Sequence, residues 1–150
     1  MYKNSVTHYI AKGAVDVLFY LGIAATVLVP WWSKFLRDAL SYTNTEWYIM
    51  IGVLMLSGVC AVYILFVIKG MFKTLLGNNP FVMANVSAFR KVAVACAAVA
   101  VIYIVKCFLM FTVGTVVIAA IFVLGSLFCL TLKDIFKQAV CYKEENDLTV

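Results

Sequence analysis

The stretch GNNPFVMANVSAFRK, residues 77–91, separates two pairs of apolar segments and therefore decides how the chain folds. It is the only long polar interruption between those pairs, and it ends in the adjacent basic residues Arg90 and Lys91. Asparagine is a favourable helix N-cap, and proline is favoured at the first helical position, where its missing N–H would be unbonded anyway. We therefore expect Asn79 to cap a helix that starts at Pro80 and leads into the third apolar segment.

The composition on both sides of this stretch is that of a membrane protein. Of 150 residues, 65% are hydrophobic and 13% are charged, whereas soluble domains are about half apolar and about a quarter charged. A soluble fold of this size could not cover so much apolar surface, so the excess must face lipid. We expect an all-α integral membrane protein with four transmembrane helices in one bundle. The four spans are predicted at about residues 13–32, 47–68, 92–111 and 115–132.

The last two spans come from one long apolar segment, residues 92–132, whose only charged residue is Lys106. A single helix of that length would measure about 60 Å, roughly twice the hydrocarbon core of a bilayer. The chain must therefore turn back, and its turn-forming sequence lies at residues 112–115. The sequence predicts a tight antiparallel hairpin with its turn at this position.

Small residues within the spans predict where helices approach closely, because such residues let helix backbones meet in a membrane. The residues concerned are Gly22, Ala25 and Thr26 in the first span, Ser57, Gly58 and Ala61 in the second, Ala93 and Ala97 in the third and Gly125 in the fourth. Residues 33–46 are amphipathic, and we expect them to form a short helical connection along the membrane surface.

The basic residues predict the orientation. Nine of the 12 Lys and Arg residues lie in the amino-terminal segment, in the loop 69–91 or in the tail 133–150. Cytoplasmic segments are enriched in Lys and Arg. Both termini and the loop 69–91 are therefore expected in the cytosol. Because these bases flank apolar segments, we interpret them as topology signals and contacts to anionic lipids of the bilayer, and we expect no nucleic-acid binding.

Two ionisable residues lie inside apolar segments. Asp16 follows Lys12 by four residues, so an i, i+4 ion pair is the simplest interpretation. A carboxylate that binds a proton or a cation, and a contact to Arg90 or Lys91, are the alternatives. Lys106 is only about 9 Å of helical rise from the predicted turn, so its side chain can reach outward to the interface. A cavity for an anionic ligand is the alternative for Lys106.

Two motifs, NPFVMANVSAFRKVA at residues 79–93 and KEENDLTV at residues 143–150, resemble a known family. It is the family of small bacterial four-helix membrane proteins typified by YoaS, whose function is unknown. The resemblance implies four spans and a multi-pass protein of the bacterial cytoplasmic membrane, encoded beside a small helix-turn-helix regulator. No catalytic or ligand residues are established for the family, so the resemblance implies none here. The matching positions are Asn79, Pro80, Phe81, Asn85, Arg90, Glu145, Asn146, Asp147, Leu148 and Thr149.

No motif for catalysis or metal binding is present. The chain has one histidine, His8, and no HExxH, GxSxG, phosphate-loop or CxxC pattern. A single histidine without a partner motif makes neither a zinc site nor a base–nucleophile pair. We therefore expect no enzymatic activity, no cofactor and no metal.

The first functional hypothesis is a non-enzymatic membrane protein with a regulatory, accessory or immunity role, which acts through a protein partner on its cytosolic face. The candidate interaction surface consists of Asn79, Pro80, Phe81, Asn85, Arg90, Lys91, Glu145 and Asp147, with the acidic tail either folded back onto residues 77–91 or solvated. The alternative is a small homo-oligomeric transporter or channel, for which Asp16 is the only candidate carboxylate within the spans.

Overall fold

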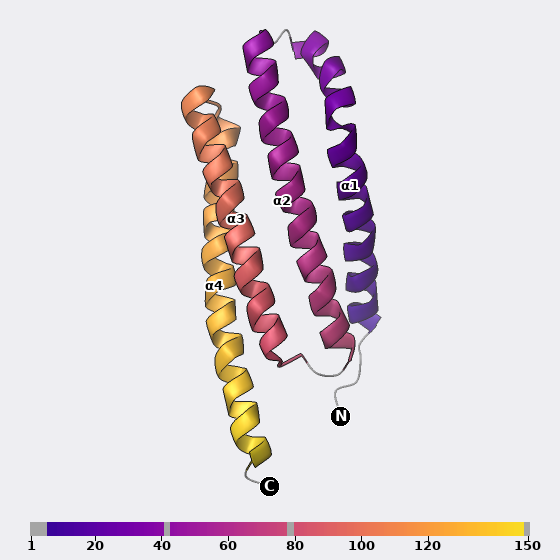
Figure 1. Cartoon of the computed structure of the whole chain (residues 1–150), viewed down its shortest axis with the longest axis vertical. Coiled ribbons are helices and arrows are strands. Elements are labelled where there is room, and N and C mark those ends of the chain that lie inside the picture. Colours follow the sequence, from indigo (N-terminus) through magenta and orange to yellow (C-terminus); the bar gives the residue numbers. More distant parts are fainter. Residues whose placement is uncertain (1–5, 41–42, 78–79, 149–150) are drawn as a thin grey trace.

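The protein is a set of four long helices, seen in a computed structural model that describes residues 6–40, 43–77 and 80–148. Side chains at 7, 36, 38–40, 147 and 148 lie outside that description. The helices are α1 (Val6–Leu40), α2 (Asn44–Leu76), α3 (Met83–Leu109) and α4 (Val113–Leu148) (Figure 1). Each is long and apolar enough to cross a membrane, and the described residues contain no strand. The all-α, four-helix fold class is confirmed, and the chain is a multi-pass membrane protein.

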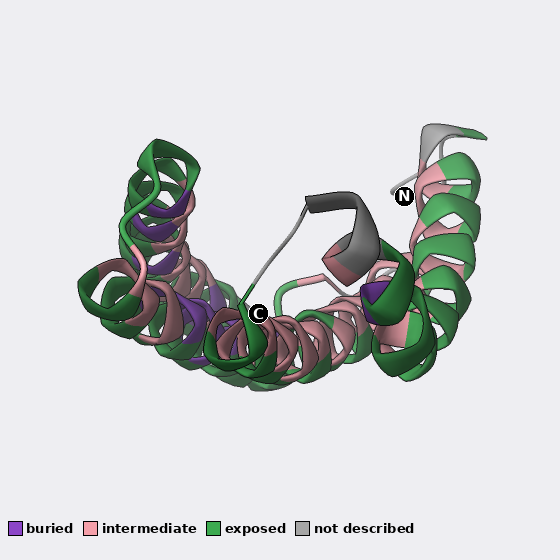
Figure 2. Ribbon diagram, turned by 90° about the horizontal axis from the view of Figure 1, so that it is seen from above, coloured by how far each residue is buried: buried purple, intermediate pink, exposed green. Residues whose placement is uncertain are grey.

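The helices lie in a row in the order of the sequence. Contacts join α1 to α2, α2 to α3 and α3 to α4, and no other pair of helices is in contact within the described ranges. Short connections make consecutive helices antiparallel neighbours. Figure 2 shows that the row is curved and that fully buried residues are few and mostly on α3 and α4. Most apolar side chains therefore face outward, toward lipid.

The contact between α3 and α4 is built from small residues, as helix packing in membranes favours. Ala93 is 1% exposed, and its carbonyl oxygen accepts a hydrogen bond of 2.9 Å from the hydroxyl of Ser126. The prediction for Ala93 is confirmed. The prediction for Ala97 and Gly125 is wrong, because Ala97 is exposed and a Cβ at Gly125 would meet nothing within 4 Å. Ser126, one residue further along, takes the place predicted for Gly125.

Glycines bring α1 and α2 together. A Cβ at Gly58 would lie 2.8 Å from the Thr26 hydroxyl oxygen, and one at Gly22 would lie 3.5 Å from a methyl of Val62. Gly22, Thr26 and Gly58 therefore form the close approach that the sequence predicts. The prediction for Ala25 and Ala61 is wrong, because both residues are exposed. The Ser57 hydroxyl donates to the carbonyl of Val53 in its own helix.

The first helix continues through the connection predicted at residues 33–46. Pro30 lies inside α1, where it removes one backbone hydrogen bond and favours a bend. Figure 1 shows the last turns of α1 inclined toward α2. The Ser33 hydroxyl donates to the Pro30 carbonyl at 2.9 Å, and Trp47 Nε1 donates to the Ser33 carbonyl at 3.1 Å. The predicted helical turns exist, but they extend α1 and do not begin a separate surface segment.

The two remaining connections also differ in length from the predictions. α2 ends only at Leu76 and α3 begins at Met83, so the loop predicted at 69–91 is far shorter. The predicted helix start at Pro80 is wrong by three residues, because Val82 is extended and acts as the N-cap; Asn79 lies outside the described residues. The hairpin of the last two spans is confirmed, with its turn at 110–112, and Gly114 lies in the first turn of α4.

Candidate functional site

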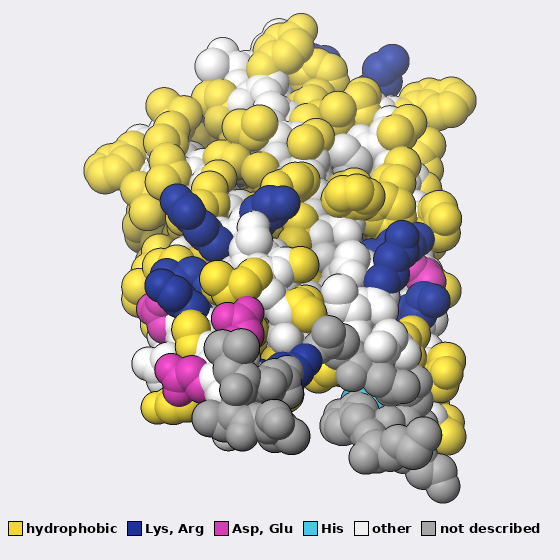
Figure 3. All heavy atoms as spheres, turned by 60° about the horizontal axis from the view of Figure 1, so that its bottom comes forward, with side chains coloured by type: hydrophobic (Ala, Val, Ile, Leu, Met, Phe, Trp, Pro, Cys, Tyr) yellow, Lys and Arg dark blue, Asp and Glu magenta, His cyan; other side chains and the backbone are white. Residues whose placement is uncertain are grey.

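Charged side chains gather at the end of the molecule that contains the α2–α3 connection. Figure 3 views this end and shows basic side chains on it, with acidic ones beside them and apolar sides behind. The elements that meet here are the end of α2, the start of α3 and the part of α4 at residues 134–148, called the α4 extension below. Six of the eight candidate interaction residues have described side chains at this end: Pro80, Phe81, Asn85, Arg90, Lys91 and Glu145.

Asn85 holds the α2–α3 connection together. It lies in the first turn of α3 and is 5% exposed. Its side-chain nitrogen donates to the Pro80 carbonyl at 2.7 Å, and its side-chain oxygen lies 2.9 Å from the hydroxyl of Thr74 on α2. That hydroxyl is also 2.7 Å from the Met71 carbonyl, and its single proton serves both acceptors. Asn85 thus links the end of α2, the connection and the start of α3.

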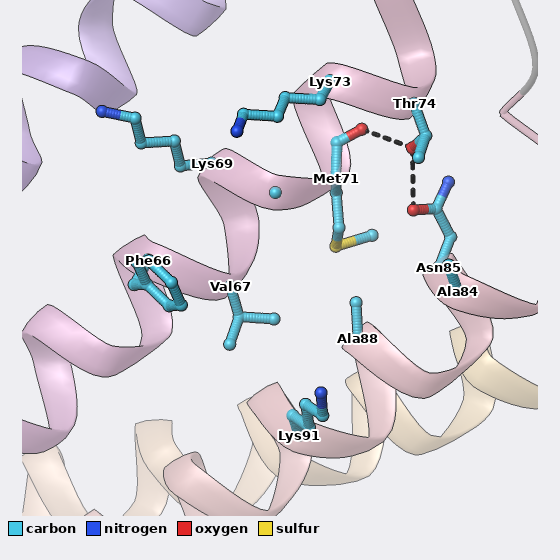
Figure 4. A pocket seen from close by; sticks show the side chains of 11 residues that line it. Phe66, Val67, Lys69, Met71, Lys73, Thr74, Ala84, Asn85, Ala88 and Lys91 are labelled. Atoms are coloured by element: carbon cyan, nitrogen blue, oxygen red, sulfur yellow. Dashed lines mark hydrogen bonds between the residues drawn. The ribbon is translucent and has the colours of Figure 1, made fainter. Parts of the chain in front are cut away.

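A cavity of about 340 Å³ lies beside Asn85, between α2 and α3 (Figure 4). Its lining includes three basic residues, Lys69 and Lys73 on α2 and Lys91 on α3, together with Thr74. Lys91 lies across the cavity from the α2 residues, whereas the side chain of Lys69 is directed away from α3 (Figure 4). Lys73 and Lys91 are exposed at the edge of the cavity. Positive charge therefore gathers where the two helices leave the bilayer.

Asp16 is paired with a neighbouring helix. Its carboxylate lies 3.0 Å from the ammonium group of Lys69 on α2, and both side chains are about two-thirds buried. The same ammonium group lies 5.2 Å from the ring centroid of Phe19 and 5.1 Å from that of Tyr20. The predicted pair with Lys12 is wrong, because the carboxylate faces α2 and meets Lys69 there. Figure 4 shows Lys69 directed toward α1.

Aromatic rings join the α2–α3 connection to α4. The ring of Phe136 on α4 lies 5.8 Å from that of Phe81 and 4.8 Å from that of Phe89, measured between centroids. Separations of this size are typical of attractive aromatic pairs. Phe81 therefore packs against α4, although it stays 43% exposed.

The acidic tail continues as helix and does not fold back. α4 runs without interruption to Leu148, and Figure 1 shows it projecting beyond the ends of the other helices. The predicted return of the tail onto residues 77–91 is therefore wrong, since an unbroken helix cannot reverse. Glu145 is exposed and lines a shallow cavity of about 480 Å³ on the α4 extension, with Lys137, Cys141 and Tyr142. The side chain of Asp147 lies outside the described residues.

Lys106 lies at the opposite end, in the last turn of α3. Its ammonium group donates to the hydroxyl of Thr115 in the first turn of α4, at 3.2 Å. Thr115 is 2% exposed. The side chain thus reaches toward the α3–α4 turn, the direction expected if it reaches the interface. Asp16 and Lys106 therefore lie at opposite ends of the molecule, each with a different partner.

The region matched by a family model begins inside α1 and covers the rest of the chain, residues 23–150; the model is described as a protein of unknown function, DUF2975. The chain belongs to the DUF2975 family. The matched residues of this DUF2975 protein include Asn85, Lys73 and Lys91, whereas Asp16 precedes them. No curated protein and no solved structure matches the chain.

Within the described residues, no group of three or more His, Cys, Asp or Glu side chains could hold a metal.

Reasoning from sequence missed Lys69, Lys73 and Thr74 as parts of this site, because it ended the second span at residue 68. One signal for them was present. No helix-breaking residue occurs between Lys69 and Leu76, apart from Gly70, and Gly77 is the first residue after them that suits a helix end. Lys69 and Lys73 are four residues apart, so a continued helix places them on one face.

Proposed function

We propose that this DUF2975 protein is a YoaS-like protein of the bacterial cytoplasmic membrane that acts without catalysis, through a protein partner bound at its cytosolic end. Its role is then regulatory, accessory or immunity-related. The distribution of Lys and Arg supports a cytosolic position for the end that carries the α2–α3 connection and the α4 extension. The polar sequence outside the spans is concentrated there.

The observation that carries the proposal is the contact of Phe136 with Phe81 and Phe89. It fixes the α4 extension to the α2–α3 connection, so two segments more than fifty positions apart in the sequence share one surface. A preorganised surface loses less entropy on binding than two independent loops would. This favours recognition of a folded partner.

The α4 extension offers an anchor of the kind that protein interfaces use. Tyr142 is 66% exposed and lines the shallow cavity together with Lys137 and Glu145. Tyrosine is enriched among the residues that dominate binding energy, and charged neighbours form a polar rim around it. The helix projects past its neighbours, so a partner can reach it from several sides.

The transporter alternative has weaker support. A coupled transporter needs a carboxylate within the spans whose charge changes during the cycle. The candidate, Asp16, is compensated by Lys69 at 3.0 Å. That arrangement is typical of a static ion pair between two packed helices.

The proposal is tested by affinity purification of the tagged protein from membranes of its native cells, followed by quantitative mass spectrometry. Tyr142→Ser is compared with Tyr48→Ser, because Tyr48 is 67% exposed and lies at the opposite end of the molecule. We expect one protein to co-purify stoichiometrically with the wild type and with Tyr48→Ser, and to be reduced about tenfold or more with Tyr142→Ser, as expected for an interface anchor.

Two outcomes would contradict the proposal. One is a wild-type preparation that contains no stoichiometric partner. The other is a partner that both tyrosine variants retain equally, which would place the binding surface away from the α4 extension.

A further inference from the structure

Two cavities follow one another along the contact of α2 and α3, and together they form the α2–α3 groove. The cavity beside Asn85, about 340 Å³, lies at the charged end. A second, of about 410 Å³, is lined by Tyr63 on α2 and by Arg90, Val94 and Ala98 on α3. Lys91 lines both. The groove therefore passes from a basic end to an apolar part.

The basic end of the groove carries uncompensated positive charge. Lys69 is neutralised by Asp16, but in the described part of the chain Lys73, Arg90 and Lys91 have no acidic partner within ion-pair distance. The described residues that line the two cavities include no Asp or Glu. α3 also begins here, and its N-cap residue Val82 provides no side-chain hydrogen bond. The first N–H groups of α3 thus add partial positive charge near Ala84 and Asn85, which line the cavity.

The position of the groove relative to the membrane points to a lipid rather than to a soluble anion. Lys69 and Lys91 are the last charged residues before the uncharged parts of α2 and α3. Ala98 is seven residues beyond Lys91, about 10 Å deeper along the helix axis. The inner part of the groove is therefore at the depth of acyl chains, while its basic end is at the depth of headgroups.

We propose that the α2–α3 groove binds one anionic phospholipid of the cytosolic leaflet. Its headgroup phosphate contacts Lys73 and Lys91, and one acyl chain lies along Tyr63, Val94 and Ala98. Charge complementarity selects the headgroup, and the small side chain of Ala98 leaves room for the chain. The site does not depend on the protein partner proposed above.

Native mass spectrometry of the detergent-purified protein tests the site by titration with phosphatidylglycerol or with phosphatidylcholine of the same acyl chains. We expect one phosphatidylglycerol to bind in preference to phosphatidylcholine. Each basic residue near a membrane surface contributes roughly a fivefold change in affinity. The double variant Lys73→Gln/Lys91→Gln should therefore bind phosphatidylglycerol about 25-fold more weakly.

The matched control is Lys133→Gln/Lys137→Gln, which removes the same charge at the same end of the molecule but from α4. Lys133 already faces Asp134 at 3.0 Å, and neither residue lines the groove. The control should bind the lipid as the wild type does. Equal losses in the two double variants would show diffuse attraction to net charge and would overturn the proposed site.

A second variant separates a lipid from a free anion. Ala98→Phe fills the inner part of the groove and leaves every basic residue in place, so it should weaken binding of the long-chain lipid severalfold. Inorganic phosphate should not displace the lipid from the wild type. Displacement by phosphate, together with unchanged binding to Ala98→Phe, would show that the basic end binds a soluble anion and that no acyl chain occupies the groove.

Discussion

At the residue scale, two glycines of α2 show how strictly position decides what a glycine does. A Cβ at Gly58 would lie 2.8 Å from Oγ1, 3.0 Å from Cγ2 and 3.4 Å from Cβ of Thr26, whereas one at Gly52 would meet nothing within 4 Å. Rotation of the Thr26 side chain leaves at least one of its two branches close to this Cβ, so it cannot remove the overlap. The Thr26 hydroxyl also donates to the Gly22 carbonyl at 2.7 Å, which further restricts that rotation. Gly58 is required by packing, and Gly52 is not.

We predict that Gly58→Ala destabilises the protein by about 1–3 kcal/mol, the usual cost of an overfilled contact. Gly52→Ala should be neutral or stabilising by up to about 1 kcal/mol, because alanine favours helix over glycine. Thermal unfolding in detergent measures both. The double variant Gly58→Ala/Thr26→Ala should recover most of the loss, and failure to recover it would show that Thr26 is not the obstacle.

At the element scale, helix ends were the hardest feature to predict. Four helices follow from composition and from the length of each apolar segment, because the backbone of a span must satisfy its own hydrogen bonds. The ends depend on single contacts that a sequence does not display. The first span was predicted to end near residue 32 and to be followed by a separate connection, yet α1 continues to Leu40, with hydrogen bonds of Ser33 and Trp47 at this point. Pro80 looked like a helix start, yet the Asn85 side chain holds its carbonyl outside the helix.

The candidate site was predicted only in part, because it too depends on contacts between helices that a sequence does not display. Asn85 and Lys91 were identified from the polar stretch itself. Lys69, Lys73 and Thr74 join them only because α2 continues for two further turns and packs against α3. The partner of Asp16 was missed likewise, since spacing within one helix favours Lys12 and only the packing of two helices brings Lys69 to it.

Asn85 provides the test at this scale. Asn85→Ala removes the donor to Pro80 and the acceptor for Thr74, and an unpaired buried polar group costs about 1–3 kcal/mol. We expect a lower unfolding temperature and faster hydrogen exchange in the connection 77–82. Ser87→Ala is the control, because Ser87 is exposed in the same part of α3. If both variants exchange at the wild-type rate, Asn85 does not hold the connection.

At the scale of the whole molecule, helix length and the positions of the charged residues together define the layer of the protein that lies within the hydrocarbon core of the membrane. α1 has 35 residues, or about 50 Å at 1.5 Å per residue, whereas the hydrocarbon core is about 30 Å thick. Asp16 and Lys34 are eighteen positions apart, about 27 Å along the helix, which matches that core. Lys106 fits the same layer, because its hydrogen bond to Thr115 directs its charge toward the α3–α4 turn. The end of the molecule with the α2–α3 connection and the end with the α3–α4 turn therefore lie at opposite membrane surfaces.

Which end faces the cytosol is predicted by the basic residues and can be tested with a native thiol. Cys141 is exposed on the α4 extension, whereas Cys60, Cys96, Cys107 and Cys129 lie within the spans. We expect a membrane-impermeant maleimide to leave Cys141 unmodified in intact cells and to modify it after lysis. Thr45→Cys in a Cys141→Ser background should behave in the opposite way, since Thr45 is exposed at the other end. Modification of Cys141 in intact cells would show that the topology is the reverse of the one predicted. The Lys73 and Lys91 site would then face the outer leaflet, and a cytosolic partner could not reach Tyr142.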